Sequence, residues 1–537
     1  MKKLPISIQT FEKIREADLI YVDKTNFIYN LVSEGTYYFF ARPRRFGKSL
    51  LLTTLKSFFQ GKKELFKGLY IYDKEKDWTV YPVIHIDYSK VEYRDTKEIF
   101  TSSMVFHLKT IASEYEITLV EKDIATAFNE LLTKLHQKYQ QRVVILVDEY
   151  DKPLVDSLTK PAEFERNRLI LSSLYGTMKG HDGYLRFVFL TGVSRFSKVN
   201  VFSGMNNLDD ISMNKEFSTL LGFTQSELET YFKDHLAKLA DTFDRSVPAL
   251  LPGIKEWYNG FSFDGINKLY NPFSILKLFT EYEFRNYWFS TGTPTFLIDL
   301  IKKQKRLPEE FEHVKVTDLV GSTEQIKNFP LIPLLYQTGY LAIEKTGRDD
   351  LSPYYFLNYP NREVRHSFLR HITAAFLNKD EFSIQPEALA LRDALIEENI
   401  PKFVKKFQSF LSDIPGRLHI PKEAYYHSLT YLMLRLIGAK TLLEKETDKG
   451  RIDAVLELPD KVYIIEFKFA KNTTIKQAST LSRRAIKQIK DKKYYEPYLG
   501  HSRRILLLGL GFLDKQLHGR VEELPTLSPP QKKHSGY

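Results

Sequence analysis

The strongest constraint on the fold is an alternation of apolar, β-like runs with helical patterns from about Tyr37 to Leu221. Such alternation is typical of a parallel sheet covered by helices, so we expect an α/β domain here. Residues 222–400 follow a mostly helical pattern instead, and a compact unit begins near Pro401. The expected strands of the first domain are YYFFA (37–41), VIHIDY (83–88), VVILVDE (143–149) and LRFVFLTGV (185–193).

The loop after the first expected strand reads RPRRFGKS, residues 42–49, and it leads into the helical sequence SLLLTTLKSFF. A strand–loop–helix arrangement suits a phosphate-binding loop, because backbone N–H groups and a helix N-terminus both attract anions. Gly47 would let the backbone approach the phosphates, Lys48 would reach the β- and γ-phosphates, and Ser49 would ligate Mg²⁺. The full pattern GxxxxGK[ST] is incomplete, since Arg42 replaces its first glycine. The loop residues expected to contact ATP are Arg45, Phe46, Gly47, Lys48, Ser49 and Leu50.

A pair of carboxylates, Asp148 and Glu149, follows the buried run VVILV about 100 residues further on. Parallel sheets bind their ligands at the carboxyl ends of their strands. We expect Asp148 to hold Mg²⁺ with Ser49, and Glu149 to polarise the water that attacks the γ-phosphate. Two acids that simply cap a strand are the alternative, and the upstream GKS sequence favours the nucleotide site.

The end of the strand at 185–193 carries Thr191, and Arg195 follows shortly after it. Thr191 could sense the γ-phosphate, and Arg195 could stabilise transferring charge in the manner of an arginine finger. Ordinary turn chemistry around Gly192 explains these residues equally well.

A second constellation lies in GRIDAVLELPDKVYIIEFKFA, residues 450–470, which we interpret as two antiparallel strands. If Pro459–Asp460 forms the turn, Asp453 lies opposite Glu466, and period-two alternation brings Lys468 to the same face. Opposed carboxylates repel one another unless a cation lies between them, and oxygen ligands suit Mg²⁺ or Mn²⁺. Lys468 could then orient a water or offset charge on a phosphorane-like transition state. An exposed hairpin with salt bridges would show the same pattern.

Positive charge is concentrated in the segment that follows this hairpin in the sequence. The chain carries a net charge of +11, and the window from Lys468 to Arg504 holds eleven Lys and Arg residues against two acids. A patch of this kind favours a polyanionic partner. The alternative is a solvated helix face, which also produces charge runs.

Together these motifs resemble a bacterial family of AAA-ATPase-like proteins that carry a C-terminal PD-(D/E)XK nuclease domain. The likeness extends over nearly the whole chain, and the missing first glycine of the phosphate loop belongs to that family's own pattern. In the C-terminal domain, Asp453, Glu466 and Lys468 occupy the matching positions of the nuclease core. The motifs that carry the resemblance are YVDKT (21–25), RPRRFGKSLL, VDEYDKP, TGVSRFS, YNGFSF, YNPFSIL and TGTPTFL.

The resemblance implies further site residues around the hairpin. The expected helix at 421–438 carries Glu423, an acid that can add a metal ligand in such nucleases. Gln488 and Tyr494 are similar to a Gln/Tyr element of some family members. The basic helix that contains them would lie along a nucleic-acid backbone, with contacts from Arg483, Arg484, Lys487, Gln488 and Tyr494.

The compartment follows from composition. The chain has no cysteine, which excludes disulfides and thiolate zinc sites and fits a reducing environment. It shows no signal peptide and no run of about 18 apolar residues, so we expect a cytoplasmic protein without a membrane partner.

We therefore expect an AAA-like P-loop ATPase core at 1–221, a helical lid and middle region at 222–400, a restriction-endonuclease-like α/β domain at 401–520 and a flexible tail at 521–537. The expected function is control of an Mg²⁺- or Mn²⁺-dependent nuclease by bound ATP, which is hydrolysed. The expected substrate is nucleic acid, with DNA favoured over RNA, in defence against foreign DNA or in mobile-element biology. The alternative is a nucleotide-switched binding or signalling module whose nuclease-like domain does not cleave. Homo-oligomer formation is left open.

Overall fold

The computed structural model divides the chain into two compact units. Unit 1 comprises Met1–Leu300 and Phe311–Arg365, and unit 2 comprises Ile301–Glu310 and His366–Tyr537. Among the described residues, no helix is both long and apolar enough to cross a membrane. The described residues are 1–195, 201, 205, 207–288, 295–304, 306, 308–319, 330–350, 352–377, 379–412, 423–437, 440–447, 450–470, 477–499, 502–513 and 516–525.

The core of unit 1 is a five-stranded sheet with the order β2-β3-β4-β1-β5, in which every pairing is parallel. Its strands are β1 Tyr37–Ala41, β2 Val83–Asp87, β3 Val143–Asp148, β4 Leu185–Gly192 and β5 Asp209–Asp210. The four strands predicted from the sequence are confirmed, and each begins at its predicted residue. β1, β4 and β3 are neighbours and run parallel, so their carboxyl ends lie at the same end of the sheet. The phosphate loop after β1 and the acids at the end of β3 are therefore close together.

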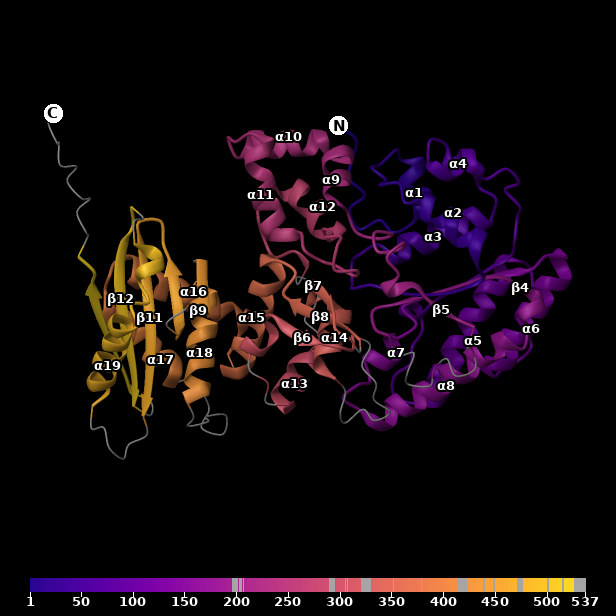
Figure 1. The fold of residues 1–537 in the computed structure, drawn as a ribbon. Helices are drawn as coiled ribbons and strands as arrows, with labels where there is room; N and C mark the ends of the chain where they lie inside the picture. The colour runs from indigo at the N-terminus through magenta and orange to yellow at the C-terminus, as the bar shows by residue number, and fades with distance from the viewer. Residues whose placement is uncertain are drawn as a thin grey trace. The chain divides into compact units, whose positions relative to one another are not determined.

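Helices cover both faces of this sheet, which explains why its strands are almost continuously apolar. In Figure 1, α5, α6 and α8 lie on one side, and α1, α2 and α3 lie on the other. Side chains of α5, α6 and α8 share one core with Phe39, Ile145 and Val188. On the opposite face, Phe59 of α3 packs on Phe187 with ring centroids 5.1 Å apart. The helices are α1 Phe11–Glu16, α2 Thr25–Glu34, α3 Lys48–Phe59, α4 Tyr70–Lys74, α5 Lys97–Glu114, α6 Ile124–Tyr139, α7 Lys152–Val155 and α8 Pro161–Lys179.

Four further helices of unit 1 form a lid with its own apolar core. That core unites Phe232, Ile254 and Leu278 of the lid with Ile20 and Val22 of the N-terminal segment. The N-terminal segment is therefore packed into the lid. The lid helices are α9 Gln225–Tyr231, α10 Lys233–Thr242, α11 Val247–Tyr258 and α12 Pro272–Glu281.

The region predicted as mostly helical also contains a three-stranded antiparallel sheet with the order β6-β8-β7. Its strands are β6 Val314–Val316, β7 Ala342–Arg348 and β8 Pro353–Asn358, and the helices of the same region are α13 Thr295–Gln304 and α14 Leu331–Thr338. The aromatic run PYYFLN of β8 is the sequence signal that could have revealed this sheet.

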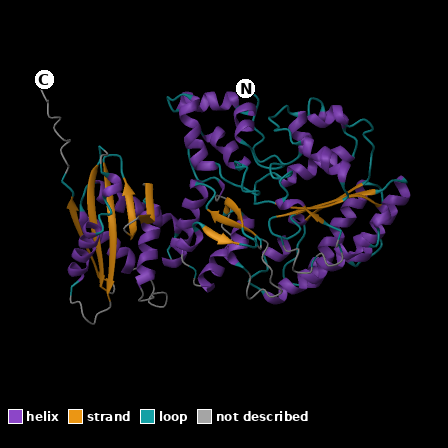
Figure 2. Cartoon of the chain, viewed as in Figure 1, coloured by secondary structure: helices purple, strands orange, loops and turns teal. Residues whose placement is uncertain are grey.

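Unit 2 is built on a five-stranded sheet with the order β13-β12-β11-β10-β9, in which only β11 and β12 pair in parallel. Figure 2 draws the strands of both units in orange. The predicted hairpin is confirmed: Ala454 pairs with Ile465, Leu456 pairs with Tyr463, and the turn lies at the predicted place. The strands are β9 Lys440–Thr447, β10 Gly450–Glu457, β11 Lys461–Ala470, β12 Arg504–Leu513 and β13 Gln516–Glu523. β13 thus extends three residues into the segment predicted as a tail, and residues 526–537 of that segment lie outside the described residues.

Helix α19 packs very closely on this sheet because β12 carries glycine where the two meet. A Cβ atom added at Gly509 would lie 2.3 Å from the Ser482 carbonyl oxygen, and one added at Gly511 would lie 2.3 Å from the Ala478 carbonyl oxygen. The sequence GLG therefore fixes the position of the basic helix. The helices of this part of the chain are α15 Arg362–Leu377, α16 Glu381–Ile396, α17 Ile400–Ser412, α18 Glu423–Leu436 and α19 Ala478–Asp491.

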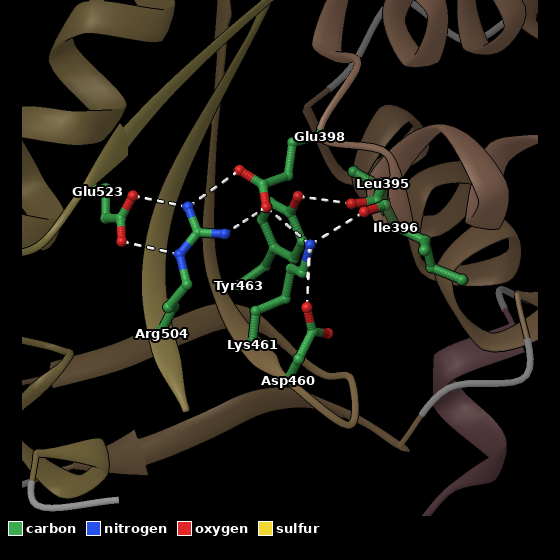
Figure 3. A network of polar contacts seen from close by, with 8 residues as sticks. All are labelled: Leu395, Ile396, Glu398, Asp460, Lys461, Tyr463, Arg504 and Glu523. Atoms are coloured by element: carbon green, nitrogen blue, oxygen red, sulfur yellow. Dashed lines mark hydrogen bonds and ion pairs between the residues drawn. The ribbon is translucent and has the colours of Figure 1, made fainter. Parts of the chain in front are cut away.

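A polar network joins the turn between α16 and α17 to the sheet of unit 2 (Figure 3). The side chain of Lys461 is only 5% exposed, and its ammonium group lies 2.7 Å from a Glu398 oxygen. Arg504 bridges Glu398 and Glu523 with contacts of 2.6 and 2.7 Å. Helices α16 and α17 therefore belong with the sheet, so unit 2 begins before the boundary expected at residue 401. The network consists of Leu395, Ile396, Glu398, Asp460, Lys461, Tyr463, Arg504 and Glu523.

Candidate nucleotide and metal sites

A cavity of about 690 Å³ opens at the edge of the unit 1 sheet where β1 and β3 end. It is lined by residues 44–51, which comprise most of the phosphate loop and the start of α3, and by Asp148 and Glu149. Apolar walls come from the N-terminal segment and from the lid, including Ile8, Phe223 and Phe273. A cavity of this size with one charged end and one apolar end suits a ligand such as a nucleotide.

The phosphate loop takes its shape from two left-handed residues. Gly47 has φ 98° and directly precedes α3, so the backbone at the helix N-terminus is free of a Cβ atom. Arg45 has φ 64°, an uncommon value for a residue with a side chain. Its guanidinium lies 3.8 Å from the ring centroid of Phe273, which holds the loop against the lid.

Lys48 lies at the bottom of the loop and is only 7% exposed. Its ammonium group donates to the carbonyl oxygens of Arg42 (2.8 Å) and Pro43 (2.9 Å). Burial lowers the pKa of Lys48, and the nearby charge of Asp148 opposes that shift. The amine is therefore positioned beside the acids of β3, as the sequence predicts.

Arg42, which replaces the expected first glycine, is a buried structural residue. Its guanidinium donates to the carbonyl oxygens of Ser212 (2.7 Å) and Phe217 (3.2 Å). It lies between the rings of Phe40 and Phe263, 4.1 and 3.9 Å from their centroids. Burial lowers its pKa to about 9. Sequence reasoning missed this role, because the acceptors lie some 170 residues away.

Asp148 and Ser49 meet in the cavity. Asp148 is buried and accepts hydrogen bonds from Thr191 Oγ1 (2.9 Å) and from the backbone N–H of Glu149 (3.0 Å). Burial raises its pKa, and hydrogen bonding with the Ser49 side chain opposes the rise. An alcohol and a carboxylate oxygen in contact at this position fit a shared Mg²⁺ ion. Thr191, which the sequence suggests as a γ-phosphate sensor, contacts Asp148 instead. It is not among the residues that line the cavity.

Asp151 is a further residue of the site, and sequence reasoning gave it no role. Its buried carboxylate accepts from the backbone N–H groups of Val193 (3.1 Å) and Ser194 (2.6 Å), and from the Ser194 hydroxyl. Gly192 is required beside it, since an added Cβ atom would lie 2.5 Å from the Tyr150 ring and 2.6 Å from Asp151. Asp151 thus ties the segment after β4 to the segment after β3.

The lid contacts the phosphate loop through the carbonyl oxygen of Arg44. This oxygen accepts from the indole N–H of Trp288 (3.2 Å) and from the Asn271 side chain (3.4 Å). Glu363, in the first turn of α15, is fully buried and accepts from the Ser274 hydroxyl (2.8 Å) and from the backbone N–H of Trp288 (2.7 Å). Burial raises the pKa of Glu363 to about 7.

In unit 2 the predicted acids and lysine of the hairpin come together. Asp453 accepts from the backbone N–H of Phe467 (2.7 Å), and Glu466 accepts from the ammonium of Lys468 (2.9 Å). Glu466 is 1% exposed, and its burial together with the charge of Asp453 raises its pKa to about 7. Its second oxygen is buried without a hydrogen-bond partner among the described residues. An acidic pair with one buried oxygen left over fits a divalent cation.

Gln488 reaches this cluster from α19. Its amide donates to the same Glu466 oxygen that contacts Lys468. Tyr494 is buried beside it; burial raises the pKa of the tyrosine, and a hydrogen bond with Gln488 opposes the rise. Both residues therefore lie at the acidic cluster, whereas Arg483, Arg484 and Lys487 are exposed on the outer face of α19.

The third predicted metal ligand of unit 2 is Glu423, whose side chain lies outside the described residues. In the part of the chain that the structure describes, no group of three or more His, Asp or Glu side chains gathers in a metal-binding arrangement.

Comparison with known proteins gives matches at both ends of the chain. Residues 5–202 match the model of a predicted AAA-ATPase family, and residues 421–521 match a PD-(D/E)XK nuclease superfamily model. A protein from Azotobacter chroococcum mcd 1, described as "Uncharacterized protein in vnfD 5'region", is 38% identical over 519 residues, which are 95% of this chain and 96% of that protein. A Drosophila ORC structure with DNA and Cdc6 is 13% identical, covers 76% of this chain and 71% of the other, and has a TM-score of 0.23, too low to support any argument.

Proposed function

Because this chain belongs to a family of predicted AAA-ATPase-like proteins that carry a C-terminal PD-(D/E)XK nuclease superfamily domain, we propose that it hydrolyses ATP and cleaves nucleic acid under control of its nucleotide state. One observation carries the proposal: each unit contains a lysine beside a pair of acids, one of which is buried. In unit 1 the cluster is Lys48 with Asp148 and Glu149, and in unit 2 it is Lys468 with Glu466 and Asp453.

In unit 1 the chemistry is hydrolysis of a triphosphate. Ser49 and Asp148 would hold Mg²⁺, which neutralises charge on the phosphates when bound. Lys48 and the N–H groups at the start of α3 bind the phosphates, and the apolar wall of the cavity receives the base. Glu149 takes a proton from the attacking water, whose oxygen forms a bond to the γ-phosphorus as the bond to ADP breaks.

In unit 2 the chemistry is hydrolysis of a phosphodiester. Asp453 and the Glu466 oxygen that has no hydrogen-bond partner among the described residues would hold Mg²⁺ or Mn²⁺, which supplies Lewis-acid activation when bound. Lys468 orients the water, and Gln488 fixes the Glu466 carboxylate. The exposed cations of α19 hold the polyanion by its phosphates, which DNA and RNA both carry. We propose DNA as the substrate, in a cytoplasmic role such as defence or mobile-element biology.

The direct test is incubation of the purified full chain with DNA and with RNA, with and without ATP and Mn²⁺. We expect Lys48→Ala to abolish nucleotide binding, and Asp453→Ala and Lys468→Ala to abolish cleavage while ATP hydrolysis continues. Lys160→Ala is the control, because Lys160 pairs with Glu163 at an exposed site. Cutting at the parent rate by all three site variants would refute the proposal.

A metal titration separates nuclease activity from a nucleotide-switched module that only binds or signals. We expect Mn²⁺ to bind unit 2 in the parent and to bind at least tenfold more weakly in Asp453→Ala. A protein that binds DNA without binding the ion at this hairpin would belong to the non-cleaving alternative.

A further inference from the structure

Arg195, which the sequence suggests as the cation for the γ-phosphate, is engaged elsewhere. Its guanidinium contacts Asp210 at 2.5 Å and 2.8 Å, and its side chain is only 12% exposed. It is not among the residues that line the cavity. If ATP is hydrolysed there, any second cation that serves the transferred phosphoryl group beside Lys48 is a residue other than Arg195.

Lys152 lies where such a cation is needed. It lines the cavity at the first residue of α7, and its ammonium group is 3.0 Å from a Glu149 carboxylate oxygen. The side chains of Lys152 and Glu149 are 34% and 39% exposed, so both can reach a ligand in the cavity.

The local backbone fixes this pair. Glu149 has φ 52°, in the left-handed region. It is held there by its own N–H, which donates to Asp148 (3.0 Å), and by its carbonyl, which accepts from the N–H of Lys152 (3.0 Å). The turn therefore brings one cation and the expected water-activating carboxylate to the same edge of the cavity.

Lys24 and Arg45, two other cations that line the cavity, have structural partners. Lys24 binds Glu227 (2.6 Å) and the Thr219 carbonyl (2.8 Å), and Arg45 stacks on Phe273. Arg44 also lines the cavity, from the exposed side of the phosphate loop, and it is the competing candidate for the test below.

Resting on the function proposed above, we propose that Lys152 is a γ-phosphate-binding residue. When ATP enters the cavity, the Lys152 ammonium group leaves Glu149 and binds the γ-phosphate. A triphosphate carries several negative charges against the single charge of Glu149, so it competes effectively for the ammonium. The exchange frees Glu149 to take the proton of the attacking water. As the oxygen–phosphorus bond forms and the bond to the β-phosphate oxygen breaks, Lys152 neutralises charge on the phosphoryl oxygens, and ADP and phosphate leave. Without nucleotide, Lys152 pairs with Glu149 again, and the Glu149 carboxylate is no longer free to take a proton.

The test compares binding of a non-hydrolysable ATP analogue with binding of ADP, both with Mg²⁺, in the full-length parent and in Lys152→Met. We expect the variant to bind the analogue about tenfold more weakly and ADP within twofold of the parent, since only the analogue has a γ-phosphate. The kcat for ATP should fall by about 10²- to 10³-fold. Lys152→Arg, which keeps the charge, should recover most of the preference for the analogue.

Lys160→Met is the matched control, because Lys160 and Glu163 form the same i,i+3 pair at the same 3.0 Å distance. Unchanged analogue-to-ADP preference in Lys152→Met would overturn the inference, as would a larger loss of that preference in Arg44→Ala or Arg195→Ala. Unaltered ADP binding shows that Lys152→Met folds. If Lys48→Ala loses nucleotide binding while Lys152→Met matches the parent, only this inference fails; if Lys48→Ala also matches the parent, the proposed ATP site fails.

Discussion

Arg42 shows how a residue that departs from the usual glycine can support the same loop. The guanidinium supports the loop from below through backbone carbonyl oxygens on the segment after β5, so a glycine in its place would leave that segment unsupported. Only a planar group with several donors meets acceptors in these directions.

We therefore expect Arg42→Lys to destabilise unit 1 by about 2 kcal/mol, because a single ammonium cannot replace the fork and leaves buried carbonyl oxygens unpaired. Thermal denaturation of the full chain, with and without ATP, measures this. Arg245→Lys is the control at an exposed arginine that does not line the cavity. A variant that melts with the parent would show that Arg42 does not support the loop.

Gly192 allows a second test, in which a single added carbon atom disturbs the packing beside Asp151. A methyl group at this position would meet Tyr150 and Asp151 inside 3 Å, so Gly192→Ala should displace Asp151 and Thr191 from the acids of β3. We expect a loss of at least tenfold in ATP hydrolysis with a lowered melting temperature. Gly183→Ala, where the added atom meets nothing within 4 Å, should behave as the parent. Equal activity of the two variants would contradict this reading of the β4 segment.

The sequence predicts site residues only where they are close in the chain or are related by a hairpin register. Lys48 and Ser49 follow one strand, and the hairpin register brings Asp453 opposite Glu466 through a turn that can be counted from the sequence. The supports of these residues could not be predicted, because Arg42 and Asp151 act through backbone groups whose positions depend on the tertiary fold. Gln488 was predicted as a residue of the basic face, but its contact with Glu466 depends on how closely α19 approaches the sheet.

Among the elements, α12 and the segment leading to Trp288 form the part of the lid that contacts the phosphate loop. Three hydrogen bonds from this part converge on the buried carboxyl of Glu363. Its pKa of about 7 lies above the ordinary value of 4.5, because ionisation without water is costly.

Glu363 should make the stability of unit 1 depend on pH. The folded state holds the proton more tightly than the unfolded state, so this stabilisation is complete below about pH 4.5 and is lost as pH rises through about 7. The parent should lose about 3 kcal/mol across that window relative to Glu363→Gln, which does not titrate. Melting temperatures of both proteins between pH 5 and 8 measure the difference. Glu98→Gln, an exposed acid in the first turn of α5, should follow the parent, and parallel curves for the parent and Glu363→Gln would refute the assignment.

The main strands were predictable because each is a continuous apolar run bounded by turns. The sheet of β6, β7 and β8 was not, because β6 has only three residues and β7 alternates poorly, with five of its seven residues at least partly exposed. The attachment of α16 and α17 to the second sheet also could not be predicted. It depends on the contacts of Lys461 and Arg504 with Glu398, and the sequence does not show the partner of a charged residue.

At the scale of the molecule, the polar network of Glu398 enlarges the C-terminal unit beyond the segment that matches the nuclease model. Lys461 and Tyr463 of β11 donate to the carbonyl oxygens of Ile396 and Leu395. Phe407 of α17 packs on Phe512 of β12 with ring centroids 6.2 Å apart.

A fragment of residues 421–537 should therefore fail to fold cooperatively, whereas a fragment of residues 379–537 should melt in one transition. The shorter fragment leaves the nearly buried ammonium of Lys461 without its main partners and exposes the apolar face that α17 covers. Circular dichroism during heating measures both. Within the longer fragment, Glu398→Ala should lower the melting temperature more than Glu387→Ala, which removes an acid from an ion pair with Lys379. A cooperative melt of the shorter fragment would refute this.

The left-handed backbone at Arg45 and Glu149 has an evolutionary consequence. Each residue costs about 1 kcal/mol relative to glycine in the same conformation, and both lie at the nucleotide cavity. A population selected for heat tolerance alone would drift towards glycine at both positions. Such variants would keep the fold and lose the Glu149 side chain that we propose to activate water.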